Sequence, residues 1–356
     1  MHQFFGVKMK FIIISIHFFD RFFITDFWFI FKKFKIYHMK AAVINQFGGP
    51  DIFEVKDIKK PMIKPDQLLI KVKASSINPI DWKQRNGNHK LVFGSPFPIV
   101  LGYDISGEVS ETGSEITKFK KGDQVYGVLD NKYGGALAEY AVGHEKCFSL
   151  KPKEIAHEEA AALPMVGLTA LQALRDHAAV REGQTILLNG ASGGVGHIAI
   201  QIAKLMNTKV IAVASEKSKP FVLQYHPDEF IDYTERDIKT LNQKVDVFFD
   251  VIGNLSFPKT KQLLKPGGIY LNLNFLHSLT KLPINKFHEL FSNGKRAKSF
   301  LMKHQSSDLE IISEWLIQQK IQVHQDKTFS LDQIQQAHEY AQKGHNKGKN
   351  VIVISE

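Results

Sequence analysis

The sequence predicts an α/β protein in which a mostly β region is followed by a doubly wound parallel sheet. Residues 40–150 contain short alternating or β-branched runs that glycine and proline turns separate. A glycine-dense turn at 190–196 then joins an apolar run to an amphipathic segment, and strand-like and helix-like segments alternate beyond it. Short runs bounded by turns are typical of β structure, and regular alternation is typical of a parallel sheet covered by helices.

The individual elements are predicted from the same patterns. In the first region, strands are predicted at 40–46, 52–58, 68–75, 103–109 and 124–129. Helical spacing begins at 156–162 and 166–175. After the turn, strands are predicted at 209–214, 230–233, 245–250 and 269–273, helices at 307–319 and 331–343, and a last strand at 350–354. Ser330 and Gln333 have the spacing of a capping box that opens the second of these helices.

The glycine-dense turn predicts a dinucleotide site. A short apolar run, 185–189, precedes it, and Ile198 and Ile202 follow at helical spacing. The residues of the turn are Ala191, Ser192, Gly193, Gly194, Val195 and Gly196, a variant of G-x-G-x-x-G with alanine first. Glycine lets the backbone approach a diphosphate closely, and the free N–H groups of the helix start hold its charge. The alternative is a tight turn with a structural role only.

Charge and cysteine content exclude several classes of protein. The formal net charge is +10 over 356 residues, and residues 1–38 supply +4 of it. The remaining +6 forms no dense basic stripe, so we expect no nucleic-acid partner. The single cysteine, Cys147, excludes a disulfide framework and favours a reducing, cytoplasmic compartment.

Residues 1–38 have a different composition, with 11 of the 27 phenylalanines of the chain. A membrane span needs about 20 nearly uncharged residues, whereas Asp20, Arg21 and Asp26 interrupt this segment. We expect Met39 to be the biological start. Weak peripheral association with a membrane and a true membrane anchor are the alternatives.

From residue 40 to 354 the chain resembles the medium-chain dehydrogenase/reductase superfamily. The matching motifs are 77–83 (INPIDWK), 98–109 (PIVLGYDISGEV), 122–127 (GDQVYG), 160–164 (AAALP), the glycine turn and 265–268 (KPGG). The resemblance implies a GroES-like β-rich catalytic domain at 39–160, an inserted Rossmann domain with a doubly wound parallel sheet at 161–300, and a return segment at 301–356. It also implies a homodimer.

Within the superfamily, the chain is similar to the zinc-independent quinone oxidoreductases, near the zeta-crystallin-like proteins and the plant alkenal and enone reductases. Zinc-dependent relatives have Gly-His-Glu where this chain has 102–104 (GYD), and they need an early cysteine that is absent here. His144 and Glu145, close to Cys147, are a weak zinc candidate because neighbouring residues of a strand face opposite sides. We therefore expect no zinc.

The cofactor predicted by this resemblance is NADPH rather than NADH. An NAD site presents an acidic residue after the second strand, where this chain has Ser215, then Glu216, Lys217 and Lys219. The lysines suit a 2′-phosphate, whereas Glu216 argues for NADH, and an exposed helix start is the alternative. The resemblance and the sheet topology add Tyr233, Asn274, Gly348, Lys349 and Asn350 as cofactor-binding candidates, with strand-end packing and an exposed turn as alternatives.

Hydride transfer to an enone or a quinone places negative charge on a carbonyl oxygen, which a donor or a cation must meet. Lys83 is the first candidate, because the resemblance places its equivalent in the cofactor and substrate cleft. Asn78 would orient neighbouring groups. Tyr103 replaces the metal-binding histidine of the zinc relatives, and it either donates a phenolic hydrogen bond or packs. Asp81 is expected to fix its loop.

The predicted function is zinc-independent, NADPH-dependent hydride transfer to quinones or α,β-unsaturated carbonyls. An enoyl-thioester reductase is the second hypothesis. The third is a non-catalytic NADPH-binding sensor or an RNA-binding crystallin-like protein. The walls of the substrate pocket are expected from loops at 86–98 and 275–286.

Overall fold

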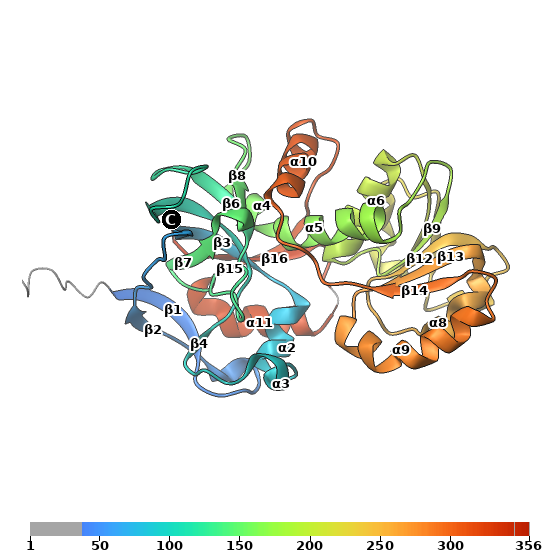
Figure 1. The fold of residues 1–356 in the computed structure, drawn as a ribbon, viewed down its shortest axis with the longest axis horizontal. Helices are drawn as coiled ribbons and strands as arrows, with labels where there is room; N and C mark the ends of the chain where they lie inside the picture. Colours follow the sequence, from blue (N-terminus) through green and yellow to red (C-terminus); the bar gives the residue numbers. More distant parts are fainter. Residues whose placement is uncertain (1–37, 345, 356) are drawn as a thin grey trace, which may run out of the picture. The chain divides into compact units, whose positions relative to one another are not determined.

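The computed structural model describes residues 38–344 and 346–355, and for residues 275–282 it describes only the backbone. Contacts divide the chain into a unit of residues 1–39 with 58–60 and a unit of residues 40–57 with 61–356. The second unit is described below (Figure 1). Residues 1–37, and with them the alternatives for the start of the chain, lie outside the described residues. Within the described residues, no helix has both the length and the apolar character needed to cross a membrane.

The first region forms two β-sheets. The smaller sheet has the order β2-β1-β4, from β1 (His38–Ile44), β2 (Phe53–Lys59) and β4 (Ile99–Val100). The larger has the order β15-β16-β3-β5-β6-β8, from β3 (Gln67–Ile77), β5 (Asp104–Thr112), β6 (Gln124–Val128), β8 (Phe148–Leu150), β15 (Gln325–Ser330) and β16 (Lys349–Val353). A further strand, β7 (Tyr140–His144), pairs with β3. The last two strands of the chain thus return to the first region.

The second sheet has six parallel strands in the order β11-β10-β9-β12-β13-β14. They are β9 (Thr185–Asn189), β10 (Lys209–Ala214), β11 (Glu229–Asp232), β12 (Val245–Asp250), β13 (Leu264–Asn272) and β14 (Arg296–Ser299). The chain starts in the middle, moves to one edge and then to the other. This is the doubly wound order, so the predicted α/β class is confirmed.

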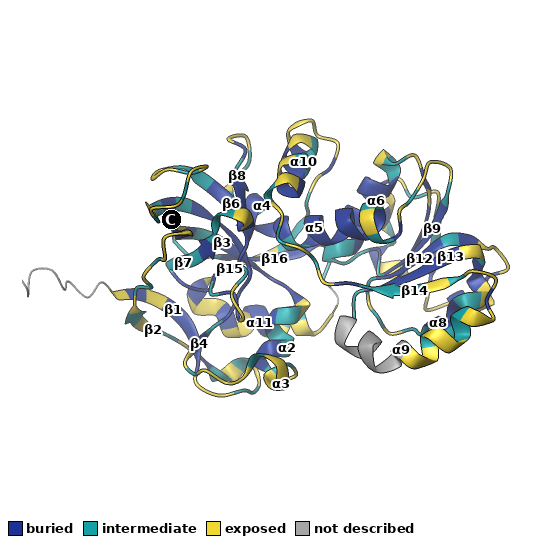
Figure 2. Ribbon diagram, viewed as in Figure 1, coloured by how far each residue is buried: buried dark blue, intermediate teal, exposed yellow. Residues whose placement is uncertain are grey.

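The parallel sheet is buried on both faces. Ile186 and Leu188 belong to the same apolar cluster as Ile198 of α6 (Gly194–Leu205), whereas Leu187 packs with Phe248 in a cluster on the other face. Alternate residues of a strand face opposite sides, which explains why β9 is apolar throughout. In Figure 2 the central strands β9 and β12 are mostly buried and the edge strand β14 is mostly intermediate, while the outward faces of the helices around the sheet are exposed.

The remaining helices connect and cover these sheets. They are α2 (Pro79–Arg85), α3 (Lys90–Phe93), α4 (His157–Ala162), α5 (Pro164–Gln172) with a π-helical turn (Ala173–His177), α7 (Lys219–Leu223), α8 (Phe257–Thr260), α9 (Phe275–Leu290), α10 (Ser306–Ile317) and α11 (Ile334–Gln342). Short 3-10 helices lie at Pro50–Ile52, Glu145–Cys147, Glu216–Ser218, Ile238–Thr240, Lys261–Leu263 and Leu331–Gln333. The capping box of Ser330 and Gln333 is confirmed.

The prediction of a loop at 275–286 is wrong, because these residues belong to α9. Pro283 lies inside this helix and removes one backbone donor, which is a helix-breaking signal in the sequence. The expected loop at 86–98 contains the short helix α3.

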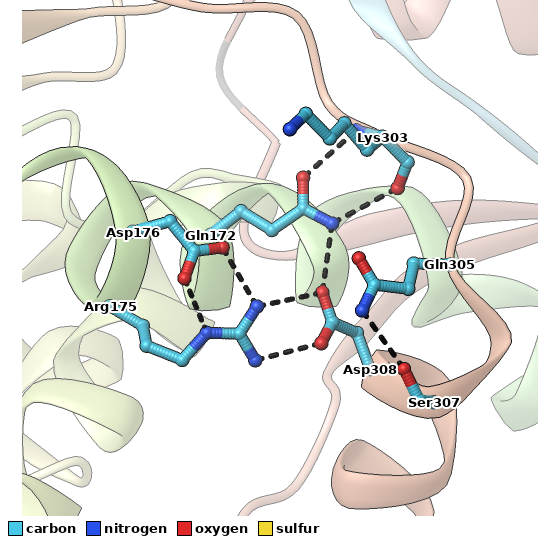
Figure 3. A network of polar contacts seen from close by, with 7 residues as sticks. All are labelled: Gln172, Arg175, Asp176, Lys303, Gln305, Ser307 and Asp308. Carbon is cyan, nitrogen blue, oxygen red and sulfur yellow. Dashed lines mark hydrogen bonds and ion pairs between the residues drawn. The ribbon is translucent and has the colours of Figure 1, made fainter.

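A polar network fastens the start of α10 and the segment before it to the end of α5 and the π-helical turn that follows (Figure 3). Arg175 donates through Nη1 and Nη2 to the two carboxylate oxygens of Asp308, at 2.7 and 3.0 Å. Gln172 donates to the same carboxylate at 2.9 Å and exchanges two hydrogen bonds with the main chain of Lys303. Planar two-point contacts of this kind fix direction as well as distance. They hold the chain where it leaves the parallel sheet.

Candidate active site

The glycine turn lies at the carboxyl end of β9, between the two halves of the parallel sheet. Gly190 has a φ of 89°, a left-handed conformation that favours glycine. The N–H groups of Gly190 and Ala191 both donate to the carbonyl of Val213 on β10, which ties the turn to the neighbouring strand. Ligands of doubly wound sheets bind at this switch point, beyond the carboxyl ends of the strands.

The packing of α6 against the turn requires glycine at residue 196. A Cβ atom at this residue would lie 2.1 Å from the carbonyl oxygen of Gly190 and 2.8 Å from the main chain of Ala191. Both are backbone atoms, so no side-chain movement relieves the overlap. The helix can approach the turn this closely only with glycine at 196.

Gly193 differs, because the protein leaves its side open. A Cβ atom there would meet only the carbonyl oxygen of Gly190, at 3.5 Å, an ordinary contact. Its backbone, with φ −79° and ψ 179°, is one that any residue adopts. Neither packing nor backbone conformation therefore demands glycine, so the open side is a cradle that a ligand can fill.

A buried histidine that the sequence analysis does not single out holds this turn. His197 lies in the first turns of α6, and its Nδ1 lies 2.9 Å from the carbonyl oxygen of Gly193. Its Nε2 accepts a hydrogen bond from the main-chain N–H of His324 at 3.2 Å. Nε2 is thus the acceptor and Nδ1 carries the proton, which fixes the neutral tautomer. Burial lowers the pKa of His197 to about 4.

A second buried histidine leads to a prediction for acid stability. Burial, then the charge of Arg85, lowers the pKa of His338 to about 3, and neither ring nitrogen has a partner among the described residues. Below pH 6.5 the histidines of the unfolded chain bind protons, whereas His197 and His338 of the folded protein stay neutral. The free energy of unfolding therefore decreases as the pH is lowered, by about 1.4 kcal/mol per pH unit for each histidine. His338→Leu should remove one such contribution, which urea titrations at pH 7 and pH 5 measure. Equal losses in wild type and variant would contradict it.

The carboxyl ends of β10 and β11 bring several predicted cofactor residues together. Ala214 is paired with Asp232, so Ser215 and Tyr233 follow on neighbouring strands. Tyr233 is 50% exposed, more than a residue that merely packs at a strand end. Lys217 is exposed and has no partner among the described residues. A hydroxyl, an aromatic ring and a cation therefore follow the carboxyl ends of the neighbouring strands β10 and β11.

Glu216, the residue that argues for NADH, is engaged with a neighbour. The ammonium of Lys219 lies 3.2 Å from its carboxylate, and both side chains are exposed. The same ammonium lies 5.6 Å from the centre of the Phe230 ring. Lys219 therefore partly offsets the acid, and Lys217 is the free cation of the pair.

The carboxyl ends of β9, β12 and β13 carry a polar network that the sequence analysis does not predict. Asp250 is fully buried and accepts hydrogen bonds from Asn189 at 2.8 Å and Tyr270 at 3.0 Å. The predicted residue Asn274 lies at the N-terminus of α9, and its N–H donates to the side chain of Asn272 at 2.6 Å. A Cβ on Gly253 would lie 3.0 Å from the Cβ of Asn274, so these loops are in contact.

The return segment meets the glycine turn directly. The N–H of Gly348 donates to the carbonyl of Ser192 at 3.0 Å, and Gly348 forms a bridge with Gly193. Asn350 is buried, and its amide oxygen has no hydrogen-bond partner among the described residues. The predicted cofactor residues of the glycine turn and of the return segment are thus in contact, and the amide oxygen of Asn350, unpartnered within the described part of the chain, is free to accept a hydrogen bond.

The side chain of Lys349, a predicted cofactor-binding residue, is engaged within the protein. Its ammonium is buried and contacts Asn78 Oδ1 at 2.6 Å, Asp104 Oδ2 at 3.1 Å and the carbonyl of Ile77 at 3.1 Å. An ammonium has three donors, so none remains for a phosphate. Asn78, predicted to orient its neighbours, donates in turn to Asp104 at 2.7 Å.

Lys83 lies on α2, five residues after the N-cap residue Asn78. Burial lowers the pKa of its ammonium, and no hydrogen bond or ion pair engages it among the described residues. Its ammonium lies 5.5 Å from the centre of the Trp82 ring. A half-buried cation without a counter-ion is suited to an anionic group of a ligand.

Tyr103 uses its phenolic hydrogen within the protein. The hydroxyl donates to the carbonyl of Lys132 at 2.6 Å and accepts from Gln84 at 2.7 Å. Burial raises the pKa of this phenol. Donation to a substrate would require the Lys132 bond to break, so the geometry favours the packing alternative.

The side chains of the predicted weak zinc candidate around His144 make other contacts. His144 lies 2.8 Å from Asp130, and Cys147 is buried, with a pKa raised by burial. Within the described part of the chain, no three His, Cys, Asp or Glu side chains are grouped so as to hold a metal ion.

Comparison with known proteins agrees with this architecture. The alcohol dehydrogenase GroES-like domain family matches residues 64–153, and the zinc-binding dehydrogenase family matches residues 225–352. The chain is 32% identical to a chloroplastic quinone-oxidoreductase homolog of Spinacia oleracea, over 86% of this chain and 95% of that protein. It is 40% identical to an NADPH-dependent alkenal/one oxidoreductase of Arabidopsis thaliana, over 65% of this chain and 61% of that protein.

A solved structure of the quinone oxidoreductase from Coxiella burnetii matches with a TM-score of 0.83 and 32% identity, over 90% of this chain and all of that one. A GroES-like β domain joined to a doubly wound sheet with a glycine turn at its switch point defines a dehydrogenase or reductase. The chain belongs to the medium-chain dehydrogenase/reductase superfamily, among its quinone oxidoreductases and alkenal reductases.

Proposed function

We propose that the protein is an NADPH-dependent reductase of quinones or α,β-unsaturated carbonyls that works without zinc. The observation that carries the proposal is Gly193, whose open side the protein itself does not need. The unused amide oxygen of buried Asn350, on the adjacent return segment, is a second feature that fits a dinucleotide. The names of the similar proteins support the substrate class.

The reduced nicotinamide, when bound, would supply the hydride. The protein must then stabilise the negative charge on the acceptor oxygen. Lys83, on the helix that precedes α3, has an ammonium group that forms no ion pair with any described residue. Asn78 is held by Asp104 and Lys349 at the N-terminus of the helix that carries Lys83. Water can supply the proton.

Zinc independence is part of the proposal and rests on the donor set. Asp104 accepts hydrogen bonds from the side chains of Ser76, Asn78 and Lys349 and from the N–H of Met165, so its two oxygens are occupied. Tyr103 is likewise bonded to Lys132. Activity that survives chelators would support this part, and a chelator-sensitive alcohol oxidation would refute it.

Selectivity for NADPH is proposed to depend on Lys217. Its exposed ammonium lies after β10, where an acidic residue would bind the ribose of NAD. Lys217→Ala should raise the KM for NADPH about fivefold, by the loss of roughly 1 kcal/mol of attraction, and leave the KM for NADH unchanged. Lys209→Ala, at the opposite end of the same strand, is the matched control. An equal change for both nucleotides would show that Lys217 does not read the 2′-phosphate.

The function is tested by one acceptor screen on protein started at Met39, with NADPH and NADH side by side. Oxidation of NADPH by a naphthoquinone or a short enone is the expected result. Activity on crotonyl thioesters far above that on free enones would favour an enoyl-thioester reductase. Binding of NADPH without turnover on any acceptor would favour a sensor.

A homodimer is proposed as the working assembly. The strand β14 lies at an edge of the parallel sheet, paired with β13 on one side only. The neighbouring helix α9 exposes Phe287 and Leu290, and its C-cap residue Phe291 is also exposed; these side chains are 61%, 79% and 73% accessible. Open strand edges and exposed apolar side chains are features that partners cover. Light scattering at micromolar concentration tests the assembly.

A further inference from the structure

Lys349 and Asp104 form an ion pair that is fully removed from solvent. Their side chains are 3% and 0% exposed, and the ammonium and carboxylate lie 3.1 Å apart. Burying two charges is costly, and a well-packed apolar pair of similar volume is often as stable. Stability alone therefore gives a weak reason for this pair, and the geometry around it offers a stronger one.

On one side, Lys349 is joined to the glycine turn. Its neighbour Gly348 donates to the carbonyl of Ser192 and bridges to Gly193. The Cδ of Lys349 would lie only 3.0 Å from a Cβ placed on Gly194, so the aliphatic stem packs against the start of α6. Lys349 and the glycine turn are therefore in direct contact.

On the other side, Lys349 holds the start of α2. Its ammonium donates to Asn78 Oδ1, and Asn78 is the N-cap residue of that helix. The main-chain N–H of Asn78 donates to Asp81 at 2.7 Å, as in a capping box. Helix α2 carries Lys83, so a continuous chain of contacts joins the turn to that cation.

We propose that Lys349 is a positioning residue, which couples the glycine turn to α2 and so places Lys83 for reaction. This inference rests on the proposed function, because Lys83 matters only if an acceptor is reduced. Lys349 itself touches neither acceptor nor nicotinamide in this role. The competing explanation is that Lys349 only neutralises the buried carboxylate of Asp104.

A charge-neutral double variant separates the two explanations. Lys349→Met alone leaves the Asp104 carboxylate buried without its counter-ion, and the protein should lose thermal stability. The double variant K349M/D104N removes both charges and should recover a melting temperature close to that of wild type. If Lys349 positions α2, kcat stays more than tenfold below wild type while the Kd for NADPH changes less than threefold. Wild-type kcat in this stable double variant would overturn the proposal.

Lys83→Ala, combined with the double variant, tests the coupling directly. In wild type, this substitution should lower kcat more than tenfold. In the K349M/D104N background it should lower kcat less than threefold further, because Lys83 is already misplaced, and coupled residues are not additive. The same factor in both backgrounds would overturn the coupling. If Lys83→Ala has no effect in wild type, the role of Lys83 fails, and the proposal fails with it.

The matched control is another buried carboxylate paired with a cation, and the hydrogen bonds of this pair among the described residues do not reach the glycine turn or α2. R175M/D308N removes the pair shown in Figure 3, whose Asp308 side chain is 2% exposed. This variant should have the kcat of wild type. In its background, Lys83→Ala should lower kcat by the same factor as it does in wild type. Absence of NADPH turnover in wild type would instead reject the proposed function, which is a different outcome from any of the above.

Discussion

Gly196→Ala is expected to cost about 3 kcal/mol or more of the free energy of unfolding and to abolish dinucleotide binding. The added Cβ would lie 2.1 Å from the carbonyl oxygen of Gly190, a backbone atom that can move only with the turn itself. Forcing atoms into a packed interior costs about 1–3 kcal/mol, and here the main chain of the turn must also shift. Urea denaturation measures the first effect, and calorimetric titration of NADPH measures the second.

The control for this substitution is Gly49→Ala. Gly49 has an extended backbone, and an added Cβ would approach only the carboxylate of Asp51, which is exposed and free to turn away. This variant should keep wild-type stability and binding. A Gly196→Ala protein as stable as the Gly49→Ala protein would show that the close approach of α6 to the turn is not needed.

Lys83→Ala is expected to lower the turnover of NADPH with quinones or enones by more than tenfold. Its ammonium is half-buried, its pKa is lowered by burial, and no described side chain forms a hydrogen bond or ion pair with it. Loss of one donor to a developing oxyanion lowers rates by about 10²–10³, so tenfold is a lower bound. The affinity for NADPH should change little, because the residue is assigned to the acceptor and not to the phosphates.

Steady-state kinetics with saturating NADPH provides the measurement, and Lys71→Ala is the control. Lys71 is an exposed lysine on β3, outside the site. Lys83→Arg should retain part of the rate, because the charge is kept. A rate for Lys83→Ala equal to that of the control would remove Lys83 from the mechanism.

The fold was predictable because its strands have strong local patterns. The residues 245–250 (VDVFFD) and 209–214 (KVIAVA) form β12 and β10 with the predicted bounds, since continuous apolar runs between turns specify buried parallel strands. The strand β14, with the sequence RAKS, was not predicted, because Ala297 is the only apolar residue in it. It forms only through parallel pairing with β13, from Ile269 to Asn272.

The site was predictable where one segment carries the whole signal. The turn at 190–196 is such a segment. The partners of Asp104, by contrast, lie 28, 26, 61 and 245 residues away in the sequence, and local spacing cannot reveal them. One signal was present: a lone acid beside an apolar run must find donors if it is buried. The same signal marks Asp250, at the end of β12.

His197 and Lys349 show the limit of reading single positions. Both were visible in the sequence, one in the glycine motif and one in the return segment. Their roles depend on contacts with His324 and with Asn78 and Asp104, which only the folded chain brings close. The sequence identifies polar residues near a candidate site, whereas the structure shows which of them are bonded to other residues of the protein.

We propose that the main chain at Gly193 receives a dinucleotide diphosphate. Gly193→Ala is the sharpest test of this binding mode, because the protein has room for the methyl group and the bound diphosphate does not. Calorimetric titrations of wild type and variant with NADPH and NADH should show tight binding of NADPH to wild type. The variant should have an unchanged melting temperature and at least tenfold weaker binding. No heat from wild type with either nucleotide, or equal affinity in the two proteins, would contradict the account.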